Sequence, residues 1–221
     1  MFQKRAFLNW SRRYRNDQYP FYSQRNVGHV LRLIERIPMK YQSRSDRKKR
    51  LYKLIVALKD IVDARHACSL FGKEINSTAS DLYYPLLNSI VISYSKPFVE
   101  NKGLGPLPGG WRKFKDRKLQ DTHDRLLKFR HDNIAHNDRS TAQVRIIPPG
   151  AKLAGQQTTA LGVSWAITRH ILDLRTFELI WNTIEDLRVR LMQAIDEEML
   201  ILYGLSQLPS EPFELTFDDG L

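Results

Sequence analysis

Cysteine is almost absent from this chain of 221 residues, which contains only Cys68. A single cysteine excludes an internal disulfide and is typical of a reducing compartment, so we expect a cytoplasmic protein. Cys68 lies among helical apolar positions, and we interpret it as a small buried hydrophobe. No apolar run approaches the ~18 residues that span a bilayer, and no signal-peptide core follows the start, so we expect no membrane partner.

Acidic residues are scarce at the beginning of the chain. Residues 1–50 contain 14 Lys and Arg against 3 Asp and Glu, whereas residues 51–221 contain 21 of each kind. The whole net charge of +11 therefore belongs to the first fifty residues. This distribution predicts an anionic partner that contacts the N-terminal segment.

Residues 1–26 interleave basic residues with the rings of Phe2, Phe7, Trp10, Tyr14, Tyr19, Phe21 and Tyr22. Positive charge with stacking rings is typical of a surface that follows a nucleic-acid backbone and stacks on its bases. In the alternative interpretation the rings pack on the domain and the cations are merely solvated. A short helix expected over 27–37 and ended by Pro38 completes a basic N-terminal arm of residues 1–46.

Two further basic segments follow the arm. The tetrad at residues 47–50 is expected to open a long helix, where four cations are unfavourable unless an anion binds nearby or solvent screens them. Residues 111–118 repeat the basic and aromatic composition. The nucleic-acid-binding candidates are Lys4, Arg5, Arg12, Arg13, Arg15, Arg47, Lys48, Lys49, Arg50, Arg112 and Lys113.

Hydrophobic periodicity predicts an all-α protein with a bundle of four long helices over residues 47–204. The expected helices are 47–73, 79–98, about 119–136, and 173–203. Residues 142–147 and 161–168 are rich in β-forming side chains and predict a small hairpin insertion over about 142–168. The connector at 99–117 has many glycines but lacks the Gly-Lys-Ser/Thr of a phosphate loop. An acidic tail, expected to be poorly ordered, covers 205–221.

The third helix carries an arginine on its apolar stripe. That stripe consists of Leu119, His123, Leu126, Leu127, Arg130 and Ile134. An unpaired guanidinium is expensive to bury, so the position of Arg130 suggests chemistry. His136 follows where the helical pattern ends, but on a regular helix it lies roughly 240° from Arg130. The two can meet only if the backbone re-aims His136 or if a second copy of the chain supplies half the site.

Arg130-His131-Asp132-Asn133-Ile134-Ala135-His136 resembles the Arg-x(4–6)-His motif of HEPN-domain proteins, as do the flanking 126–129 and the upstream 94–98. The resemblance covers roughly residues 47–204 and is strongest to HEPN-like bacterial proteins linked to phage defence. It implies a helical bundle, a homodimer with a shared site, and metal-independent cleavage of RNA without a cofactor, in defence or a toxin–antitoxin system. The tyrosine that some antitoxins modify after the motif histidine is replaced here by the sequence Asn137-Asp138-Arg139.

Metal-free RNA cleavage requires a base for the 2′-hydroxyl, cationic stabilisation of the phosphorane and a proton for the leaving oxygen. We expect Arg130 to clamp the phosphate and His136 to act as general base or acid. His131 and Asn133 position these groups, or one of them supplies the second proton function. Alternatively Arg130 forms a buried ion pair with a neighbouring helix and His136 caps its own. The carboxylates considered for that pair are Asp60, Asp63 and Glu185.

Two other interpretations remain open. His131, Asp132, His136 and Asp138 resemble a metal ligand set, but the two imidazoles lie roughly 140° apart on a helix and lack the His-Glu-x-x-His spacing. The other is a non-catalytic HEPN-like dimerisation module that binds nucleic acid or protein through its basic arm.

Overall fold

A computed structural model describes most of the chain beyond the N-terminal arm. Its described residues are 43–75, 80–100, 103–135, 143–148, 152–153, 156–157, 164–168, 174–204 and 211–215. The predicted helix at 27–37 and the rest of the arm before residue 43 lie outside this set, as does most of the predicted tail.

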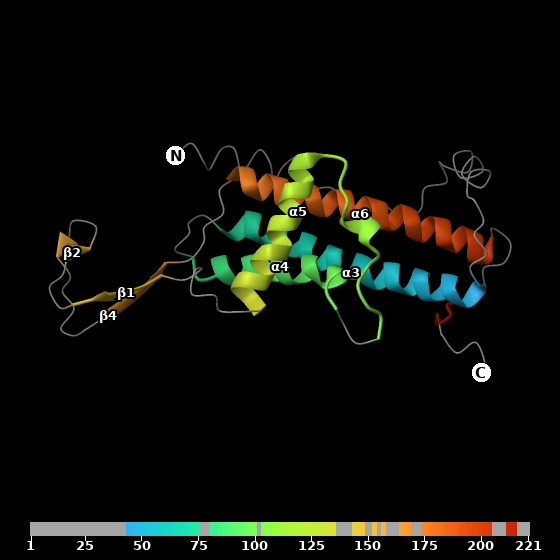
Figure 1. The fold of residues 1–221 in the computed structure, drawn as a ribbon, viewed down its shortest axis with the longest axis horizontal. Helices are drawn as coiled ribbons and strands as arrows, with labels where there is room; N and C mark the ends of the chain where they lie inside the picture. The colour runs from blue at the N-terminus through green and yellow to red at the C-terminus, as the bar shows by residue number, and fades with distance from the viewer. Residues whose placement is uncertain are drawn as a thin grey trace.

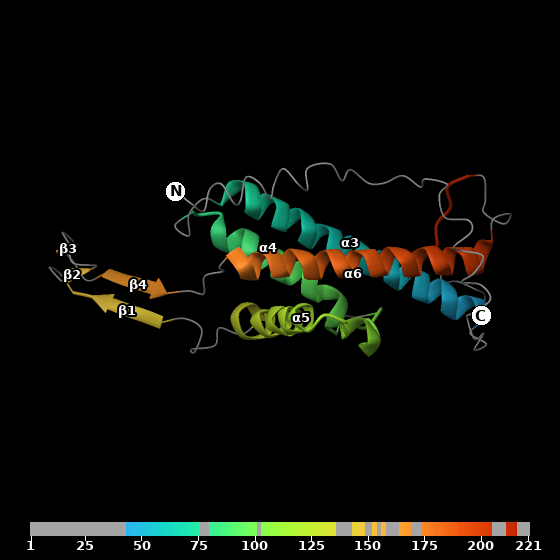
Figure 2. The ribbon, with the colours of Figure 1, turned by 90° about the horizontal axis from the view of Figure 1, so that it is seen from above.

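Helices account for most of the described chain, as predicted. The α-helices are α3 (Arg44–Glu74), α4 (Tyr83–Ser95), α5 (Arg117–Phe129) and α6 (Leu174–Tyr203). Two short 3-10 helices, η1 (Lys96–Phe98) and η2 (Gly109–Arg112), flank the loop before α5, and a π-helical turn, η3 (Arg130–Ala135), follows it. The long helices α3 and α6 lie side by side, α4 packs on α3, and α5 runs steeply across α6 (Figures 1 and 2).

Capping groups explain where these helices begin and end. Ser43 caps α3 by accepting a hydrogen bond from the Asp46 amide at 3.1 Å, and Asp46 places a negative charge in the first turn. The helix therefore begins three residues before the predicted start, and the basic tetrad does not occupy its first turn. At the C-terminal end of the last helix, Gly204 follows α6 and has a φ of 58°, a left-handed conformation that suits a residue without a Cβ.

The second helix is shorter than predicted, because α4 begins only at Tyr83 and ends at Ser95. Pro85 then falls in the first turn, where its missing amide costs nothing. The chain continues as the 3-10 turn η1, which contains Pro97. The Pro97 carbonyl accepts a hydrogen bond from the Leu107 amide at 2.7 Å and so ties the following loop to the end of α4.

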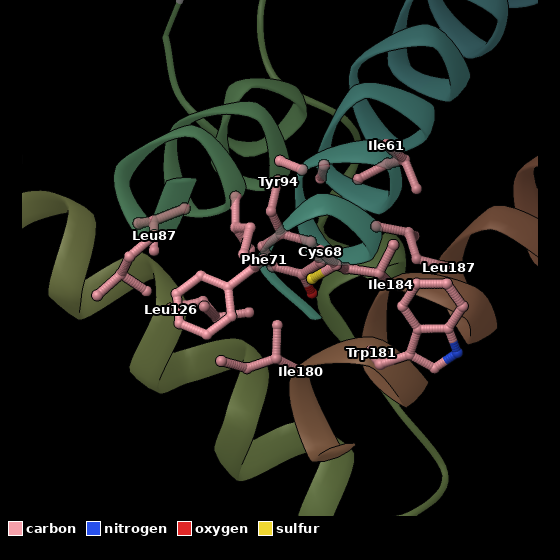
Figure 3. Packing of buried hydrophobic residues seen from close by; sticks show 14 of the residues in the cluster. Ile61, Cys68, Phe71, Leu87, Tyr94, Leu126, Ile180, Trp181, Ile184 and Leu187 are labelled. Carbon is pink, nitrogen blue, oxygen red and sulfur yellow. The ribbon is translucent and has the colours of Figure 1, made fainter. Parts of the chain in front are cut away.

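The core lies between α3, α4 and α6, with the C-terminal part of α5 packed against it through Leu126 (Figure 3). Its α3 positions follow alternate steps of three and four residues: Leu54, Ala57, Ile61, Ala64, Cys68 and Phe71. The apolar pattern of the sequence marks Leu51, Leu54, Ile61, Cys68 and Phe71 as core positions, and all five are buried, but Ile55, which the same pattern marks, is 43% exposed. On α4 the predicted Leu82 is 50% exposed and the neighbouring Tyr83 is buried instead. The alanines of the stripe are weakly hydrophobic, so the apolar pattern of the sequence does not mark them as core positions.

A second, smaller cluster closes the far ends of α3 and α6, where Leu51 packs with Leu202 and Tyr203. Beside it the Glu198 carboxylate, 4% exposed, is paired with Arg47 at 3.3 Å and with Arg50 at 3.2 Å. The anionic partner expected for these two arginines is therefore provided by the protein itself. Residues 211–215 of the predicted poorly ordered tail also pack here, with the Phe213 ring 5.4 Å from that of Tyr203.

Two short antiparallel strand pairs extend away from the helices (Figures 1 and 2). Strand β1 (Gln143–Ile147) pairs with β4 (Ser164–Thr168), and β2 (Lys152–Leu153) pairs with β3 (Gln156–Gln157). In the first pair Gln143 lies opposite Thr168 and Ile147 opposite Ser164. Strands β1 and β4 fall within the two β-rich segments of the sequence, whereas β2 and β3 lie in the connection between them, where a loop was expected.

Replacing Glu198 by Gln is expected to lower the free energy of unfolding by about 2 kcal/mol, since two arginines then lose a buried counter-charge. Urea denaturation of the purified protein measures this difference. Asp63→Asn is the matched control, because it removes a carboxylate from the exposed pair with Lys59. Equal effects of the two substitutions would contradict the anchoring role of Glu198.

Candidate functional site

The predicted catalytic arginine lies at the junction between two kinds of helix. The Arg130 amide donates to the carbonyls of both Leu126 and Leu127, so the last turn of α5 tightens just before the wider π turn begins. The π turn covers Arg130–Ala135. Such turns are rare and occur frequently at functional sites. This one coincides with the Arg-to-His motif.

The side chains of the motif are placed only in part. Arg130 is half-buried and His131 is exposed. The Asp132 carboxylate lies 3.9 Å from the Lys128 ammonium, one helical turn earlier. The Asn133 side chain and the whole of His136 lie outside the described residues, so their predicted roles stay predictions.

The π turn changes the geometry on which the sequence prediction was based. A regular α-helix turns by about 100° per residue, and on that basis Arg130 and His136 were placed on different faces. A π turn closes with a bond over five residues and rotates less per residue. The regular helix already ends at Phe129, before the motif begins, and not near His136 as expected. The angular spacing of the motif residues therefore departs from that of a regular helix from Arg130 onward.

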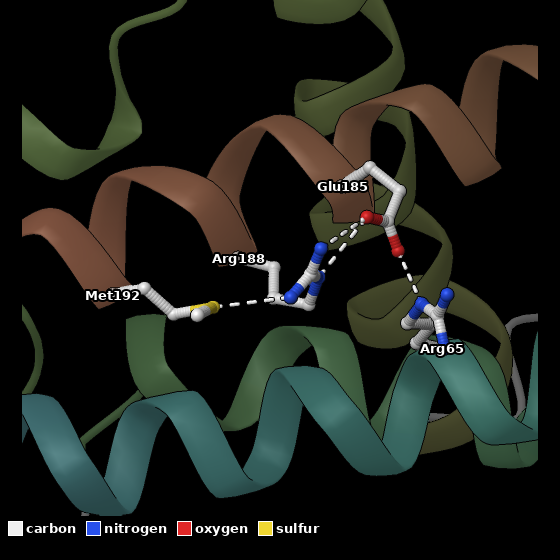
Figure 4. Close-up of polar contacts among 4 residues, drawn as sticks. All are labelled: Arg65, Glu185, Arg188 and Met192. Carbon is white, nitrogen blue, oxygen red and sulfur yellow. Dashed lines mark hydrogen bonds and ion pairs between the residues drawn. The ribbon is translucent and has the colours of Figure 1, made fainter. Parts of the chain in front are cut away.

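The carboxylates that were considered as buried partners of Arg130 all pair with other cations. Glu185 is held by two arginines: Arg65 Nε donates to it at 2.5 Å, and Arg188 contacts it through Nε at 3.0 Å and Nη2 at 2.9 Å (Figure 4). Arg188 also donates to the Met192 sulfur at 3.0 Å. Glu185 thus joins α3 to α6 and is already paired with two cations other than Arg130.

The remaining two carboxylates lie on α3. Asp60 pairs with Lys96 at 3.3 Å and Asp63 pairs with Lys59 at 2.8 Å. Within the described part of the chain, no ion pair involves Arg130. Its half-buried guanidinium therefore keeps its charge available to an anion from outside.

The same helix face carries a buried histidine, His123, which was predicted to lie on the apolar stripe and is 0% exposed. Its Nδ1 lies 2.7 Å from the Tyr94 hydroxyl oxygen, and its ring packs against Phe98 and Phe114 with centroids 4.7 and 5.2 Å away. No described atom accepts or donates at Nε2. Burial lowers the pKa of His123 to about 4, against a smaller opposite effect of Asp124. The ring is thus neutral at neutral pH and serves to dock α5.

The predicted nucleic-acid-binding residues separate into three groups. Those of the arm, Lys4, Arg5, Arg12, Arg13 and Arg15, lie outside the described residues. Arg47 and Arg50 are occupied by Glu198, while Lys49 is exposed and Lys48 half-buried on the same helix. Arg112 is exposed and donates to the Phe98 carbonyl at 2.5 Å, and Lys113 is exposed beside it.

Neither a metal centre nor a membrane span is found in the part of the chain that the structure describes. No three His, Cys, Asp or Glu side chains gather there within reach of one ion. Of the four metal-ligand candidates in the motif, His131 and Asp132 are described, whereas His136 and Asp138 lie outside the described residues. None of the described helices is long and apolar enough to cross a bilayer.

The buried state of His123 predicts a stability that depends on pH. Its folded pKa of about 4 lies below the ordinary 6.5, so between these values the unfolded chain binds more protons. Stability is complete above about pH 6.5 and falls by about 3 kcal/mol as the pH drops through this window to about 4. Urea denaturation across this range should show wild type losing more stability than His123→Phe. Parallel pH curves of the two proteins would contradict it.

No protein-family model, no curated protein and no solved structure matches this chain. The resemblance to HEPN-domain proteins therefore depends on the motif residues and on the arrangement of the helices. The function is inferred from the geometry and charge of this chain alone.

Proposed function

We propose that this protein is a metal-independent endoribonuclease of the HEPN type, acting as a cytoplasmic homodimer in phage defence or a toxin–antitoxin system. One observation carries the proposal: the motif arginine begins a π turn, and no described residue neutralises its charge. A half-buried guanidinium at an irregular helix end is suited to hold a phosphate. The buried Cys68, which has no disulfide partner, fits a reducing compartment.

The chemistry follows from the groups at this turn. Arg130 grips two non-bridging oxygens of the scissile phosphate and stabilises the charge of the phosphorane. His136 removes the proton of the 2′-hydroxyl or protonates the leaving 5′-oxygen, because its ordinary pKa lies near neutral pH. His131 and Asn133 position these groups, or one of them supplies the second proton transfer. The products are a 2′,3′-cyclic phosphate and a free 5′-hydroxyl.

A homodimer completes the site in this proposal. Helix α5 packs on α6 and α4 with one face only, and its opposite face, which includes Asp121, Arg125 and Lys128, is exposed. The π turn therefore lies at the surface of one copy, where the motif of a second copy can approach it. Two copies related by a two-fold axis supply two arginines and two histidines to one RNA strand.

Arg130→Ala is expected to lower RNA cleavage by at least 100-fold while the protein stays folded, because the phosphorane loses its cationic clamp. Cleavage of a generic RNA in EDTA measures the effect, with the product ends analysed for 2′,3′-cyclic phosphates. His136→Ala is expected to behave in the same way, since a proton-transfer group is lost.

The matched control is Arg125→Ala, which removes an exposed arginine from the same helix five residues earlier and should leave the cleavage rate unchanged. Arg130→Lys keeps the charge but not the forked donors, so partial activity is expected. If folded wild-type dimer leaves RNA intact, the nuclease proposal is wrong and the dimer is a binding module. If Arg130→Ala unfolds the protein, Arg130 has a structural role instead.

Deleting residues 1–26 should weaken RNA binding and flatten its dependence on salt, because the arm contributes phosphate contacts that release counterions. Fluorescence anisotropy at several salt concentrations gives both quantities. Each lost phosphate contact is expected to reduce the logarithmic salt slope by about 0.7. A chain with Gln at Lys4, Arg5, Arg12, Arg13 and Arg15 separates charge from ring stacking. Unchanged affinity and slope in both variants would disprove a nucleic-acid-binding arm.

A further inference from the structure

A cleft of about 870 Å³ opens between α3, α6 and the loop that contains η2. It is lined by residues 49–54 of α3, residues 103–111 of the loop and residues 190–197 of α6, and Arg130 is not among them. Helix α5 begins beside this loop and ends at the motif, and its 13 residues span about 20 Å. The cleft is therefore a second feature, separate from the proposed catalytic turn.

Cations dominate the charged residues of the cleft. Lys49, Lys53, Arg50 and Arg190 line it against one described carboxylate, that of Glu197. Arg50 is already neutralised by Glu198, outside the lining. Lys49 and Lys53 stand one turn apart on α3, so they share a face, and within the described part of the chain neither has an ion pair. The Lys53 ammonium lies 3.9 Å from the position that a Cβ would take at Gly105, on the loop side.

The opposite part of the cleft offers an aromatic ring. Trp111 is half-buried and lines the cleft from η2, and the Arg190 guanidinium lies 5.9 Å from its centroid and 4.5 Å from that of Phe114. Arg190 is held in place by the Lys113 carbonyl, which accepts from Nη1 at 3.1 Å, and by Asp186 at 2.8 Å. Its buried Nη2 has no hydrogen-bond partner among the described atoms. The ring is therefore backed by a fixed cation.

The rest of the lining is apolar. It includes Leu54, Leu104, Leu107, Pro108 and Ala194. An apolar and aromatic wall beside two lysines one turn apart matches the needs of a nucleotide strand, whose bases stack while its phosphates require positive charge. The exposed Arg112 and Lys113 extend the positive charge from the cleft toward the beginning of α5. An acidic peptide would satisfy the lysines but leave the ring and the apolar wall without a ligand group to stack on.

We propose that this cleft binds a short stretch of single-stranded nucleic acid, with phosphates on Lys49 and Lys53 and a base against Trp111. The inference rests on the proposed function only in taking RNA as the natural strand. The site requires neither a particular base sequence nor a 2′-hydroxyl, because lysines contact phosphates and any base presents a face for stacking. Bound there, the strand is positioned to continue along α5 toward Arg130.

The test uses a fluorescent single-stranded DNA oligonucleotide, which cannot be cleaved by attack of a 2′-hydroxyl. Lys49→Ala/Lys53→Ala is expected to weaken its binding about tenfold and to reduce the salt slope by about 1.4, or 0.7 for each phosphate. Trp111→Ala is expected to weaken binding roughly tenfold with no change in slope, since stacking releases no counterions. Trp111→Leu guards against a packing defect and should weaken binding similarly.

The control Lys59→Ala/Lys73→Ala removes the same charge from exposed positions of α3 outside the cleft and should leave the affinity unchanged. Equal affinity and slope for the cleft variant and wild type would overturn the inference. The inference would also fail if the cleft variant bound polyglutamate more weakly than wild type but bound the oligonucleotide equally well. The cleft would then be a site for an acidic protein segment. If the cleft residues are needed to bind DNA but the wild-type protein does not cleave RNA, the nuclease proposal is wrong and the cleft inference stands. RNA cleaved with unchanged KM by the cleft variant would refute the cleft alone.

Discussion

The packing of α3 against α6 is the interaction on which the rest of the structure depends. Small side chains at Ala57 and Ala64 and large ones at Ile61 and Phe71 of the α3 stripe are buried in one cluster with apolar side chains of α6. Two carboxylates of α6 then fix the register of the pair: Glu185 near the middle and Glu198 near the end. Each is shared by two arginines, so sliding of one helix along the other would strand several buried charges.

Both proposed sites are consequences of that register. The cleft takes its lysines from α3 and its Arg190 from α6, so the two sets of cations face each other only while these helices stay aligned. The motif depends on it indirectly, because α5 packs on α6 and α4 through Leu126 and His123. His123 fills space between aromatic rings and shares one hydrogen bond with Tyr94. Its imidazole stays neutral because burial lowers its pKa. A rigidly docked α5 gives the π turn a defined starting point.

The helices could be predicted because their signals are local. Periodic apolar residues marked α3 and α6 to within a few residues, and Gly204 marked the end of the last helix. The predictions that were wrong concern which residues are buried or paired, and these depend on contacts with other helices that a single sequence does not reveal. Ile55 is more hydrophobic than Ala57, yet Ala57 is buried, because Ala57 and not Ile55 lies on the helix face that meets the core cluster. The interpretation of Arg47 and Arg50 as nucleic-acid contacts missed Glu198, which lies about 150 residues away in sequence.

The candidate site shows the same division between local and distant signals. The Arg130-to-His136 spacing is visible in the chain, but the π turn that changes its geometry is not, because a π turn is defined by backbone hydrogen bonds that the spacing of side chains does not reveal. The cleft could not be predicted from the sequence at all, because it depends on contacts between distant residues. The Arg190 guanidinium, for example, donates to the Lys113 carbonyl, 77 positions away. Once assembled, the two features occupy the opposite ends of α5. In the proposed function, a strand that stacks at Trp111 and runs the length of this helix would reach Arg130 after a few nucleotides, so the cleft would set the distance between the point of binding and the point of cleavage.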